Sequence, residues 1–331
     1  MTATEATPAR PRLLSLSPSR AADFKACPLL FRFRTVDHLP EIPSSAAARG
    51  TLVHTVLERL FDLPAPERTL PAARGLLAPA WADQLAREPG LATLFAPPAA
   101  ETPIAVQLAV DLDLPEVPGS GEAQLHAWLA SAADLLATYF RLEDPTRLEP
   151  DSREERIEVE TAGMRLRGIV DRIDVSPAGD IRIVDYKTGA SPRAAFESRA
   201  LFQMKFYALV IWKTRDVVPA VLQLVYLADG DTLVYRPEAE ELEAFARTLT
   251  AIGAAIAQAQ EAQDFRPHPS RLCDWCSFKA HCPAFGGTVP PYPEGVAPTP
   301  SEFANPTSSS TTGSSNAFQA GNTNGASVVT R

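Results

Sequence analysis

The sequence predicts an α/β domain in which helices flank a central sheet. Residues 48–63 and 121–143 carry apolar side chains at helical spacing. Three stretches between residues 154 and 187 alternate apolar and polar side chains, as strands do. Further helical and alternating patterns follow up to about residue 263, so helices and strands are interleaved along the chain.

The first helix is expected to begin at Ser17 or Ser19, because either side chain can cap it. Pro28 should break or kink this helix directly after Cys27. The other expected elements are helices 48–63 and 121–143, an antiparallel meander of strands 154–161, 164–175 and 180–187, helix 197–213, strands 220–228 and 232–237, and a long helix through about 263.

The domain organisation follows from these patterns and from composition. The packed domain is expected to span residues 15–285, with a helical insertion at about 64–150. Residues 1–14 are expected to be a flexible N-terminal arm. Residues 286–331 contain too few apolar side chains to offset the entropy of ordering, so a disordered tail is expected there.

Composition narrows the class of protein. The 331 residues are 45% apolar, which suffices for a large core, and the formal net charge of −9 excludes a generally basic nucleic-acid coat while permitting a local positive groove. No apolar run approaches the ~20 residues of a membrane span, and the N-terminus lacks the apolar centre of a signal peptide, so a cytoplasmic protein is expected. Four cysteines without a secretion signal favour metal or cluster ligation over disulfides.

Two carboxylates and a lysine in the meander are the first candidates for chemistry. Side chains alternate along a strand, so Asp185 and Lys187 should share one face of the sheet, and Val184 and Tyr186 the other. A hairpin between this strand and the preceding one would bring Asp171 close to Asp185. The strands therefore predict two carboxylates and an ammonium group in one place.

Such a charged group is costly on an apolar sheet face unless it binds something. Mg²⁺ or Mn²⁺ would offset that cost, because these hard cations prefer oxygen ligands and phosphate partners. The alternative is an ordinary cross-strand salt bridge, with Lys187, Arg172 or Arg182 as the cation. The pattern of residues alone leaves both interpretations open.

The segments "GIVDRID" and "IVDYKTG" resemble the active-site motif of the PD-(D/E)XK nuclease superfamily. They resemble in particular its RecB-like group, which includes the AddB nuclease domain and the iron–sulfur CRISPR-associated nucleases. Two further motifs of that group match: a histidine on an upstream helix, at His54, and a Q-x-x-x-Y pair on the following helix, at Gln203 and Tyr207. The resemblance covers about residues 15–285 and implies a restriction-endonuclease-like core with a mixed sheet.

The resemblance also implies a function and a role for each residue. It implies an Mg²⁺- or Mn²⁺-dependent exonuclease that hydrolyses DNA at single-stranded ends during repair or recombination. The implied catalytic residues are Lys187, Asp171, Asp185, Gln203 and Tyr207, and the implied metal ligands are His54, Asp171, Asp185 and the backbone carbonyl of Tyr186. Glu58 and Glu155 are candidates for supporting the metal from further away. The sequence has no Walker A motif, so any helicase motor would belong to a separate partner.

The four cysteines are Cys27, Cys273, Cys276 and Cys282, with the last three spaced C-x2-C-x5-C. Thiolates suit zinc and iron–sulfur clusters alike, and spacing alone favours zinc. The RecB-like group often carries a 4Fe-4S cluster held by one cysteine before the nuclease core and three after it. The resemblance therefore implies a 4Fe-4S cluster that joins the N- and C-terminal segments.

Two functions other than catalysis stay open. The chain could be a non-catalytic module that binds DNA or a helicase through a nuclease-like fold stapled by a cluster or by zinc. It could also be a zinc-stapled structural protein in which Asp171, Asp185 and Lys187 form only ion pairs.

Overall fold

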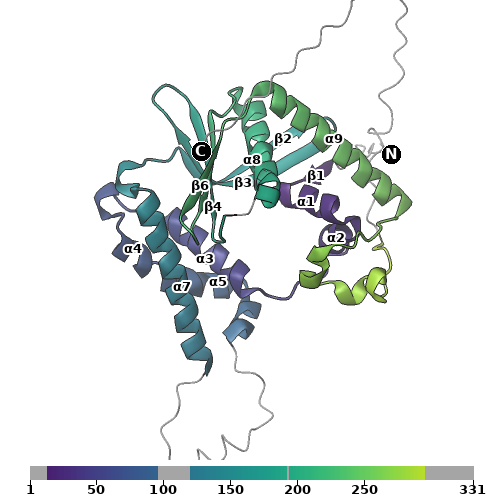
Figure 1. Cartoon of the computed structure of the whole chain (residues 1–331), viewed down its shortest axis with the longest axis horizontal. Helices are drawn as coiled ribbons and strands as arrows, with labels where there is room; N and C mark the ends of the chain where they lie inside the picture. The colour runs from purple at the N-terminus through teal and green to yellow at the C-terminus, as the bar shows by residue number, and fades with distance from the viewer. Residues whose placement is uncertain (1–12, 96–119, 192–193, 295–331) are drawn as a thin grey trace, which may run out of the picture.

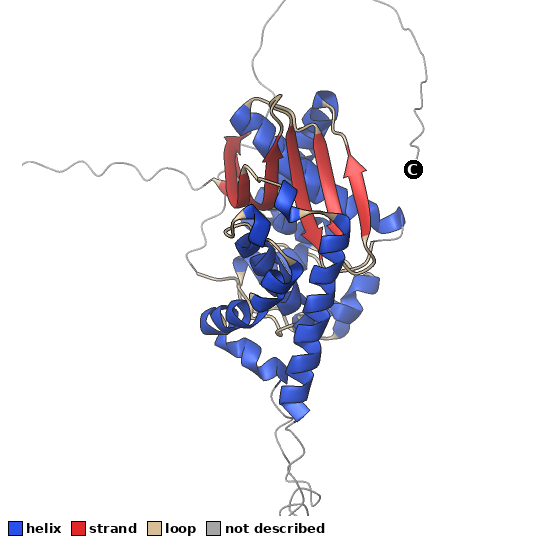
Figure 2. Cartoon of the chain, turned by 90° about the vertical axis from the view of Figure 1, so that its left-hand side faces the viewer, coloured by secondary structure: helices blue, strands red, loops and turns tan. Residues whose placement is uncertain are grey.

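The computed structural model describes residues 13–95, 120–191 and 194–294. Its centre is a six-stranded mixed sheet with helices packed around it (Figures 1 and 2). The strands are β1 (Leu14–Leu16), β2 (Ser152–Thr161), β3 (Met164–Val175), β4 (Ile181–Lys187), β5 (Val221–Tyr226) and β6 (Asp231–Tyr235). The expected mixed sheet is therefore present, although the short strand β1 was not expected.

The β2–β3–β4 part of the sheet is the predicted antiparallel meander. A two-residue turn at Ala162 and Gly163, both with positive φ, joins β2 to β3 and pairs Thr161 with Met164. Turns of this kind have a twist that matches the strands they connect, so they fix the register of a hairpin. The parallel pairing of β4 with β5 and of β1 with β3 makes the sheet mixed.

One edge of β3 is only partly used. Strand β2 occupies the other edge along most of its length, from Met164 to Ile173. On the free edge, β1 pairs with residues 164–166 and β4 with residues 172–175. In the described residues no strand pairs with residues 167–171 on this edge, and we call this interval the β3 gap. Asp171 is the last residue of this gap.

Helices α1 (Pro18–Ala26), α8 (Ala194–Arg215) and α9 (Ala239–Ala262) contribute to the core on one face of the sheet. Helix α1 has Ser17 as its N-cap and ends at Cys27, after which Pro28 opens the short helix α2 (Pro28–Phe31). The expected break at Cys27 is confirmed. The core of this face includes sheet residues such as Ile183 and Leu224.

The other face of the sheet is covered by α3 (Ser45–Leu60), α4 (Leu70–Gly75), α5 (Leu77–Arg87) and α7 (Ser120–Leu142). Val184 and Tyr186 of β4 belong to this second core, which confirms that they face away from Asp185. Shorter helical turns lie at Arg32–Val36, Ala65–Glu67, Pro89–Phe95, Pro145–Arg147, Arg271–Trp275, Lys279–His281 and Pro283–Phe285. No helix in the described ranges is long and apolar enough to cross a membrane.

The N- and C-terminal segments of the described chain lie side by side, as α2 and the last helical turns show in Figure 1. Phe33 contacts Phe278 with ring centroids 5.4 Å apart. Tyr292 stacks on Phe265 at 6.4 Å, and Arg32 donates a 2.6 Å hydrogen bond to the carbonyl of Pro290. The expectation of a disordered tail from residue 286 was therefore wrong for residues 286–294, because aromatic packing continues past Phe285.

The remaining expectations about the ends and the insertion concern residues that the structure does not describe. Most of the predicted arm (1–12), part of the helical insertion (96–119) and the rest of the predicted tail (295–331) lie outside the described residues.

Candidate active site

A chain of polar contacts connects the end of β4 with α8. Lys187 Nζ lies 2.6 Å from Asp185 Oδ2 and donates a 2.9 Å hydrogen bond to Gln203 Oε1. Gln203 Nε2 in turn donates to Asp185 Oδ1 at 2.9 Å and to the Tyr207 hydroxyl at 2.8 Å. The four side chains share one network because Asp185 and Lys187 alternate onto the α8 face and Gln203 and Tyr207 are one helical turn apart.

Asp171 and His54 meet at the adjacent end of the β3 gap. The last β3–β4 pair is Arg172 with Val184, so the backbone N–H of Tyr186 has no strand partner there. That N–H instead donates a 2.7 Å hydrogen bond to Asp171 Oδ2. His54, on α3, places Nδ1 3.4 Å from the same oxygen and Nε2 2.9 Å from the carbonyl oxygen of Tyr186.

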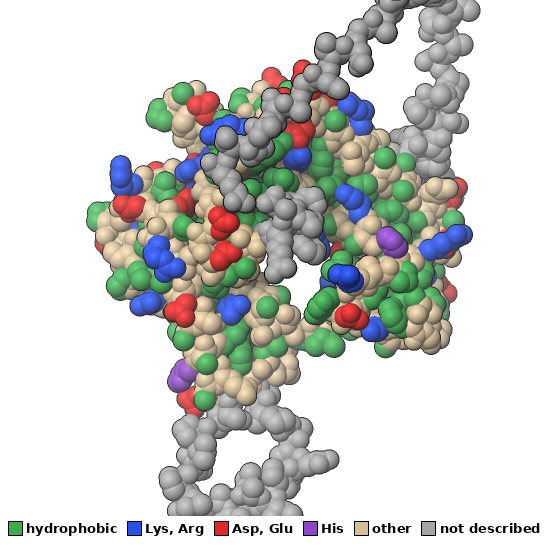
Figure 3. Space-filling view, viewed as in Figure 1, with side chains coloured by type: hydrophobic (Ala, Val, Ile, Leu, Met, Phe, Trp, Pro, Cys, Tyr) green, Lys and Arg blue, Asp and Glu red, His purple; other side chains and the backbone are tan. Residues whose placement is uncertain are grey.

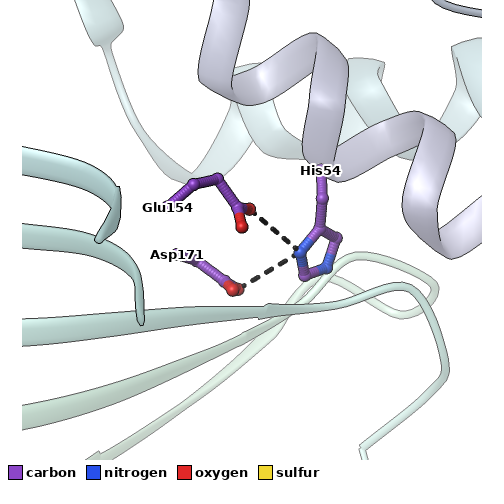
Figure 4. A group of neighbouring side chains, drawn as sticks. All are labelled: His54, Glu154 and Asp171. Carbon is purple, nitrogen blue, oxygen red and sulfur yellow. Dashed lines mark ion pairs between the residues drawn. The ribbon is translucent and has the colours of Figure 1, made fainter. Parts of the chain in front are cut away.

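Glu154 of β2 completes this group, although no motif in the sequence indicates it. Its Oε1 lies 3.9 Å from His54 Nδ1, and Figure 4 shows both carboxylates directed at the imidazole from the sheet side. The β2–β3 register pairs Arg153 with Arg172 and Glu155 with Val170, which sets Glu154 opposite Asp171. Glu154 has φ of 45°, a left-handed conformation that is costly for a residue with a Cβ.

The expected supporting carboxylates behave differently from Glu154. Glu155 points elsewhere, where it accepts hydrogen bonds from Ser152 and from Arg215 at 2.9 Å. Glu58 lines the same hollow as His54 and Glu154, and its charge contributes to raising the pKa of Glu154.

The donor set fits a hard divalent cation. One ligand atom each from His54, Glu154 and Asp171 lies within 4.8 Å of the others, and no other group of three such ligands is found in the described residues. Asp185 is 1% exposed, and its Oδ2 accepts no hydrogen bond and has only the Lys187 ion pair. Carboxylate oxygens with one imidazole suit Mg²⁺ or Mn²⁺.

The electrostatics of the group also favour a cation. Burial lowers the pKa of His54, but Asp171, Asp185 and Glu154 outweigh it and raise that pKa to about 9. Burial and the neighbouring Asp171 raise the pKa of Glu154 to about 7, and the same two causes raise the pKa of Asp185 above its ordinary value. In the metal-free protein, too little positive charge lies near these carboxylates to balance their negative charge. Bound protons supply part of that balance.

The carbonyl oxygen of Tyr186 lies 2.9 Å from His54 Nε2, whereas the carboxylates of Asp171 and Glu154 lie nearest to Nδ1. In metal sites a ligating histidine commonly donates its other ring N–H to a backbone carbonyl, which fixes the orientation of the ring.

Arg172 lies beneath the site and does not face solvent, so it cannot contact the phosphates of a substrate. Its side chain is 1% exposed, forms two hydrogen bonds of 2.7 and 2.8 Å with Glu143, and donates at 2.6 Å to the Tyr186 hydroxyl. Asp174 adds a further contact at 3.2 Å. This buried pair attaches the residue that follows α7 to the middle of β3.

The four cysteines surround one small cavity of about 60 Å³ between α1–α2 and the C-terminal helical turns. Cys27, from the end of α1, lines it together with Cys273, Cys276 and Cys282. Backbone N–H groups point at two of the sulfurs: that of His268 at Cys27 Sγ and that of Ser270 at Cys273 Sγ, both at 3.3 Å. The residues that were expected to meet from the two ends of the chain do line one cavity.

Fold and site together define a nuclease-like α/β protein, and comparison with known proteins agrees. The model of the PD-(D/E)XK nuclease superfamily matches residues 15–283, so the chain belongs to that superfamily. The Gene 69 protein of Mycobacterium phage L5 is 31% identical over 130 residues, which are 38% of this chain and 42% of that protein.

A crystal structure of a candidate exonuclease from Eubacterium rectale is 12% identical. The structural match covers 79% of this chain and 86% of the Eubacterium rectale chain, with a TM-score of 0.49.

Proposed function

We propose that this protein is a divalent-metal-dependent deoxyribonuclease, an exonuclease that hydrolyses phosphodiester bonds at single-stranded DNA ends in repair or recombination. The observation that carries the proposal is the position of Lys187. Its ammonium group lies 2.6 Å from Asp185, beside the cluster of His54, Glu154 and Asp171. Membership of the PD-(D/E)XK nuclease superfamily supports it.

In the proposed site, His54 Nδ1 and the carboxylates of Glu154, Asp171 and Asp185 hold Mg²⁺ or Mn²⁺. Such an ion lowers the pKa of a bound water and neutralises charge on the phosphate when it is present. The carbonyl of Tyr186 keeps the imidazole of His54 oriented for ligation, because it accepts from the opposite nitrogen.

Lys187 positions the attacking water and balances the negative charge that develops on the phosphate oxygens. Gln203 holds Lys187 in place through its Oε1 and holds Asp185 through its Nε2. Tyr207 fixes the Gln203 amide through its hydroxyl. Attack of water on phosphorus with departure of the 3′ oxygen gives a 5′-phosphate and a 3′-hydroxyl, as the superfamily resemblance implies.

The first test is DNA cleavage by the wild-type protein and by Lys187→Ala, each with Mg²⁺, Mn²⁺ or EDTA. Removing the ammonium group should lower the cleavage rate by at least about 10²-fold, since it acts on charge that develops in the transition state. Lys213→Ala is the matched control, because Lys213 is on α8 but packs over Trp212, 4.1 Å from the ring centroid. End-labelled linear strands and closed circles distinguish exonuclease from endonuclease action.

A folded wild-type protein that cuts no DNA with either metal would contradict the proposal. Retained DNA binding in that case would favour the non-catalytic binding module instead. Equal cleavage by Lys187→Ala and wild type would remove Lys187 from the mechanism.

We also propose that the four cysteines hold a 4Fe-4S cluster that joins the two ends of the described chain. The shared cavity and the two N–H groups directed at sulfur support this, because N–H···S contacts are typical partners of thiolate ligands. Zinc would require the four sulfurs about 3.8 Å apart, from Zn–S bonds of about 2.3 Å. No three of the cysteines form a ligand group within 4.8 Å among the described residues.

The cluster proposal predicts that anaerobically purified protein absorbs at about 400 nm and contains iron. Cys27→Ser should remove that absorbance and lower the thermal stability, since Cys27 is the ligand furthest in sequence from the other three. Lys187→Ala should keep both. Stoichiometric zinc without iron in protein kept from oxygen would contradict the cluster. Membership of the RecB-like group and a helicase partner stay predictions from sequence.

A further inference from the structure

A hollow of about 600 Å³ lies between α1, the β2–β3 hairpin and α8. Its floor is the β3 gap at Gly168, where the ring of Tyr207 packs so closely that an added Cβ would lie 2.7 Å from Tyr207 Cε1. Gln203 and Tyr207 form its inner end. The hollow therefore leads from the surface to the proposed catalytic network.

Three arginines line this hollow: Arg156 on β2, Arg167 on β3 and Arg199 on α8. All three are exposed, and none lies within ion-pair distance of a carboxylate among the side chains that the structure describes. By contrast, Arg165 on β3 pairs with both Glu158 and Glu160.

The acidic side chains near the hollow are already neutralised by other arginines. Glu158 lines the hollow and lies 3.2 Å from Arg165. The charge of Arg199 acts to lower the pKa of Asp23, after the larger effects of burial and of Arg34, and the carboxylate of Asp23 lies 2.8 Å from Arg34. Burial lowers the pKa of Arg20, and the positive charge of Arg167 lowers it further. Arg167 therefore lies near another cation. The hollow is thus a local concentration of positive charge on a protein with a net charge of −9.

The arginines also stand where this hollow meets two others. Arg156 lines a second hollow of about 640 Å³ that includes His54 and Glu154. Arg199 lines a third, of about 470 Å³, that includes His54 and Lys187. His54 thus lines both the second and the third hollow, and Glu154 lines the second, so an extended ligand could pass the site while it contacts an arginine on either side.

The dimensions favour one strand over two. A hollow of 600 Å³ has the volume of a cube about 8 Å on a side, whereas the major groove alone of B-DNA is about 12 Å wide. Unpaired guanidinium groups match phosphate oxygens in charge and geometry. We infer that this hollow is the path of a single nucleic-acid strand, whose backbone phosphates contact Arg156, Arg167 and Arg199; the inference rests on the proposed function.

The test is binding without cleavage. Fluorescence anisotropy in EDTA would follow a labelled single strand of about 16 nucleotides at several salt concentrations. The triple variant Arg156→Gln, Arg167→Gln, Arg199→Gln should bind at least about tenfold more weakly. Its slope of log K against log salt should be smaller by about 2, because each arginine bound to a phosphate of a single strand contributes about 0.7 to that slope. Arg247→Gln on α9, exposed and outside the three hollows, should bind like the wild type.

An unchanged salt slope in the triple variant would overturn the inference, and so would competition by duplex as strong as that by single strand, or no binding by the wild type. Cleavage with Mn²⁺ separates the inference from the proposed function. If the wild type binds through these arginines but does not cut, the strand path stands and the nuclease proposal fails. If the wild type cuts and the triple variant cuts with an unchanged KM, the nuclease proposal stands and the strand path fails.

Discussion

Glu154 adopts a left-handed backbone conformation near the start of strand β2, with φ of 45°, opposite Asp171. Such a conformation costs about 1 kcal/mol or more for a residue other than glycine, and burial beside other carboxylates adds to the cost. Both costs are consistent with a residue kept for binding a cation. Glu154 therefore combines a strained backbone with a side chain in the candidate metal-ligand group.

Glu154→Asn should therefore stabilise the metal-free protein and weaken its response to metal. Asparagine adopts left-handed conformations more readily and carries no charge, so we expect the free energy of unfolding in EDTA to rise by about 1 kcal/mol above the pKa of Glu154. Urea unfolding with and without Mn²⁺ measures both effects. Glu155→Asn is the neighbouring control, because Glu155 pairs with Arg215. A loss of stability in EDTA would contradict the argument.

At the residue scale, the sequence could predict which side chains meet when each belongs to a regular element. Asp185 and Lys187 follow from strand alternation, and Gln203 and Tyr207 follow from helical spacing. Glu154 was missed because its choice over Glu155 depends on the exact hairpin register. The two-residue turn ending in Gly163 carried that signal, since pairing Thr161 with Met164 sets residue 154 opposite Asp171.

At the element scale, the Arg172–Glu143 pair attaches the end of α7 to the sheet beneath the site. Removing Glu143 takes away the two shortest carboxylate contacts of the buried Arg172 and leaves it with Asp174, at 3.2 Å, as its ionic partner. Glu143→Ala should lower the free energy of unfolding by about 3 kcal/mol, as measured by urea denaturation.

The double variant Glu143→Leu, Arg172→Met should recover most of that loss, because apolar side chains of similar volume remove both charges together. Arg165→Met, at a surface pair with Glu158 and Glu160, is the control and should change stability by less than about 1 kcal/mol. A double variant as unstable as the single one would show that packing and not charge accounts for the effect.

Most elements could be predicted because their patterns are long. The alternation in β3 gave its bounds, and the helical spacing of α3 and α7 gave theirs within a few residues. Strand β1 has only three residues and forms by parallel pairing with residues 164–166. No local pattern in the sequence predicts such a contact, because the two strands are far apart along the chain. The β3 gap was unpredictable for the same reason, since it depends on where β1 ends and β4 begins.

At the scale of the whole molecule, the proposed metal links stability to pH. The pKa of His54 in the folded protein is about 9, above its ordinary 6.5, so its ionic contacts stabilise the fold below 6.5 and are lost as pH rises through 9. Glu154, with a pKa raised from 4.5 to about 7, favours its protonated form, so the metal-free fold also loses stability as pH rises through 7. Both effects have the same sign.

A divalent ion binds the deprotonated ligands, so the increase in Tm caused by Mn²⁺ should be larger above the pKa of His54 than below the pKa of Glu154. Thermal unfolding with Mn²⁺ and with EDTA across this range measures the trend. His54→Asn should flatten it. An increase in Tm that is the same at all pH values would argue that Mn²⁺ binds elsewhere.

The surface charge of the whole molecule gave little guidance to the site. Lysine, arginine, aspartate and glutamate side chains are intermixed on the face seen in Figure 3. The net charge of −9 could predict only that a positive groove would be local, because the arginines of the hollow are far apart in sequence. The predicted end of the packed domain, residue 285, was too early, because Tyr292 packs on Phe265 and the carbonyl of Pro290 accepts a hydrogen bond from Arg32. Contacts between residues so far apart in sequence leave no local pattern.

Because of the β3 gap, the backbone amides of β3 differ in how many neighbouring strands they can bond to. In residues 164–166 and 172–173 the amides lie between two neighbouring strands, whereas every second N–H and C=O of residues 167–171 is directed toward an edge without a strand. Arg167, Gly168 and Ile169 line the hollow of about 600 Å³, so this part of the strand borders an open space. In hydrogen–deuterium exchange the middle of the central strand should therefore behave like a loop while both its ends behave like a sheet, and a strand of nucleic acid in the hollow would slow that exchange.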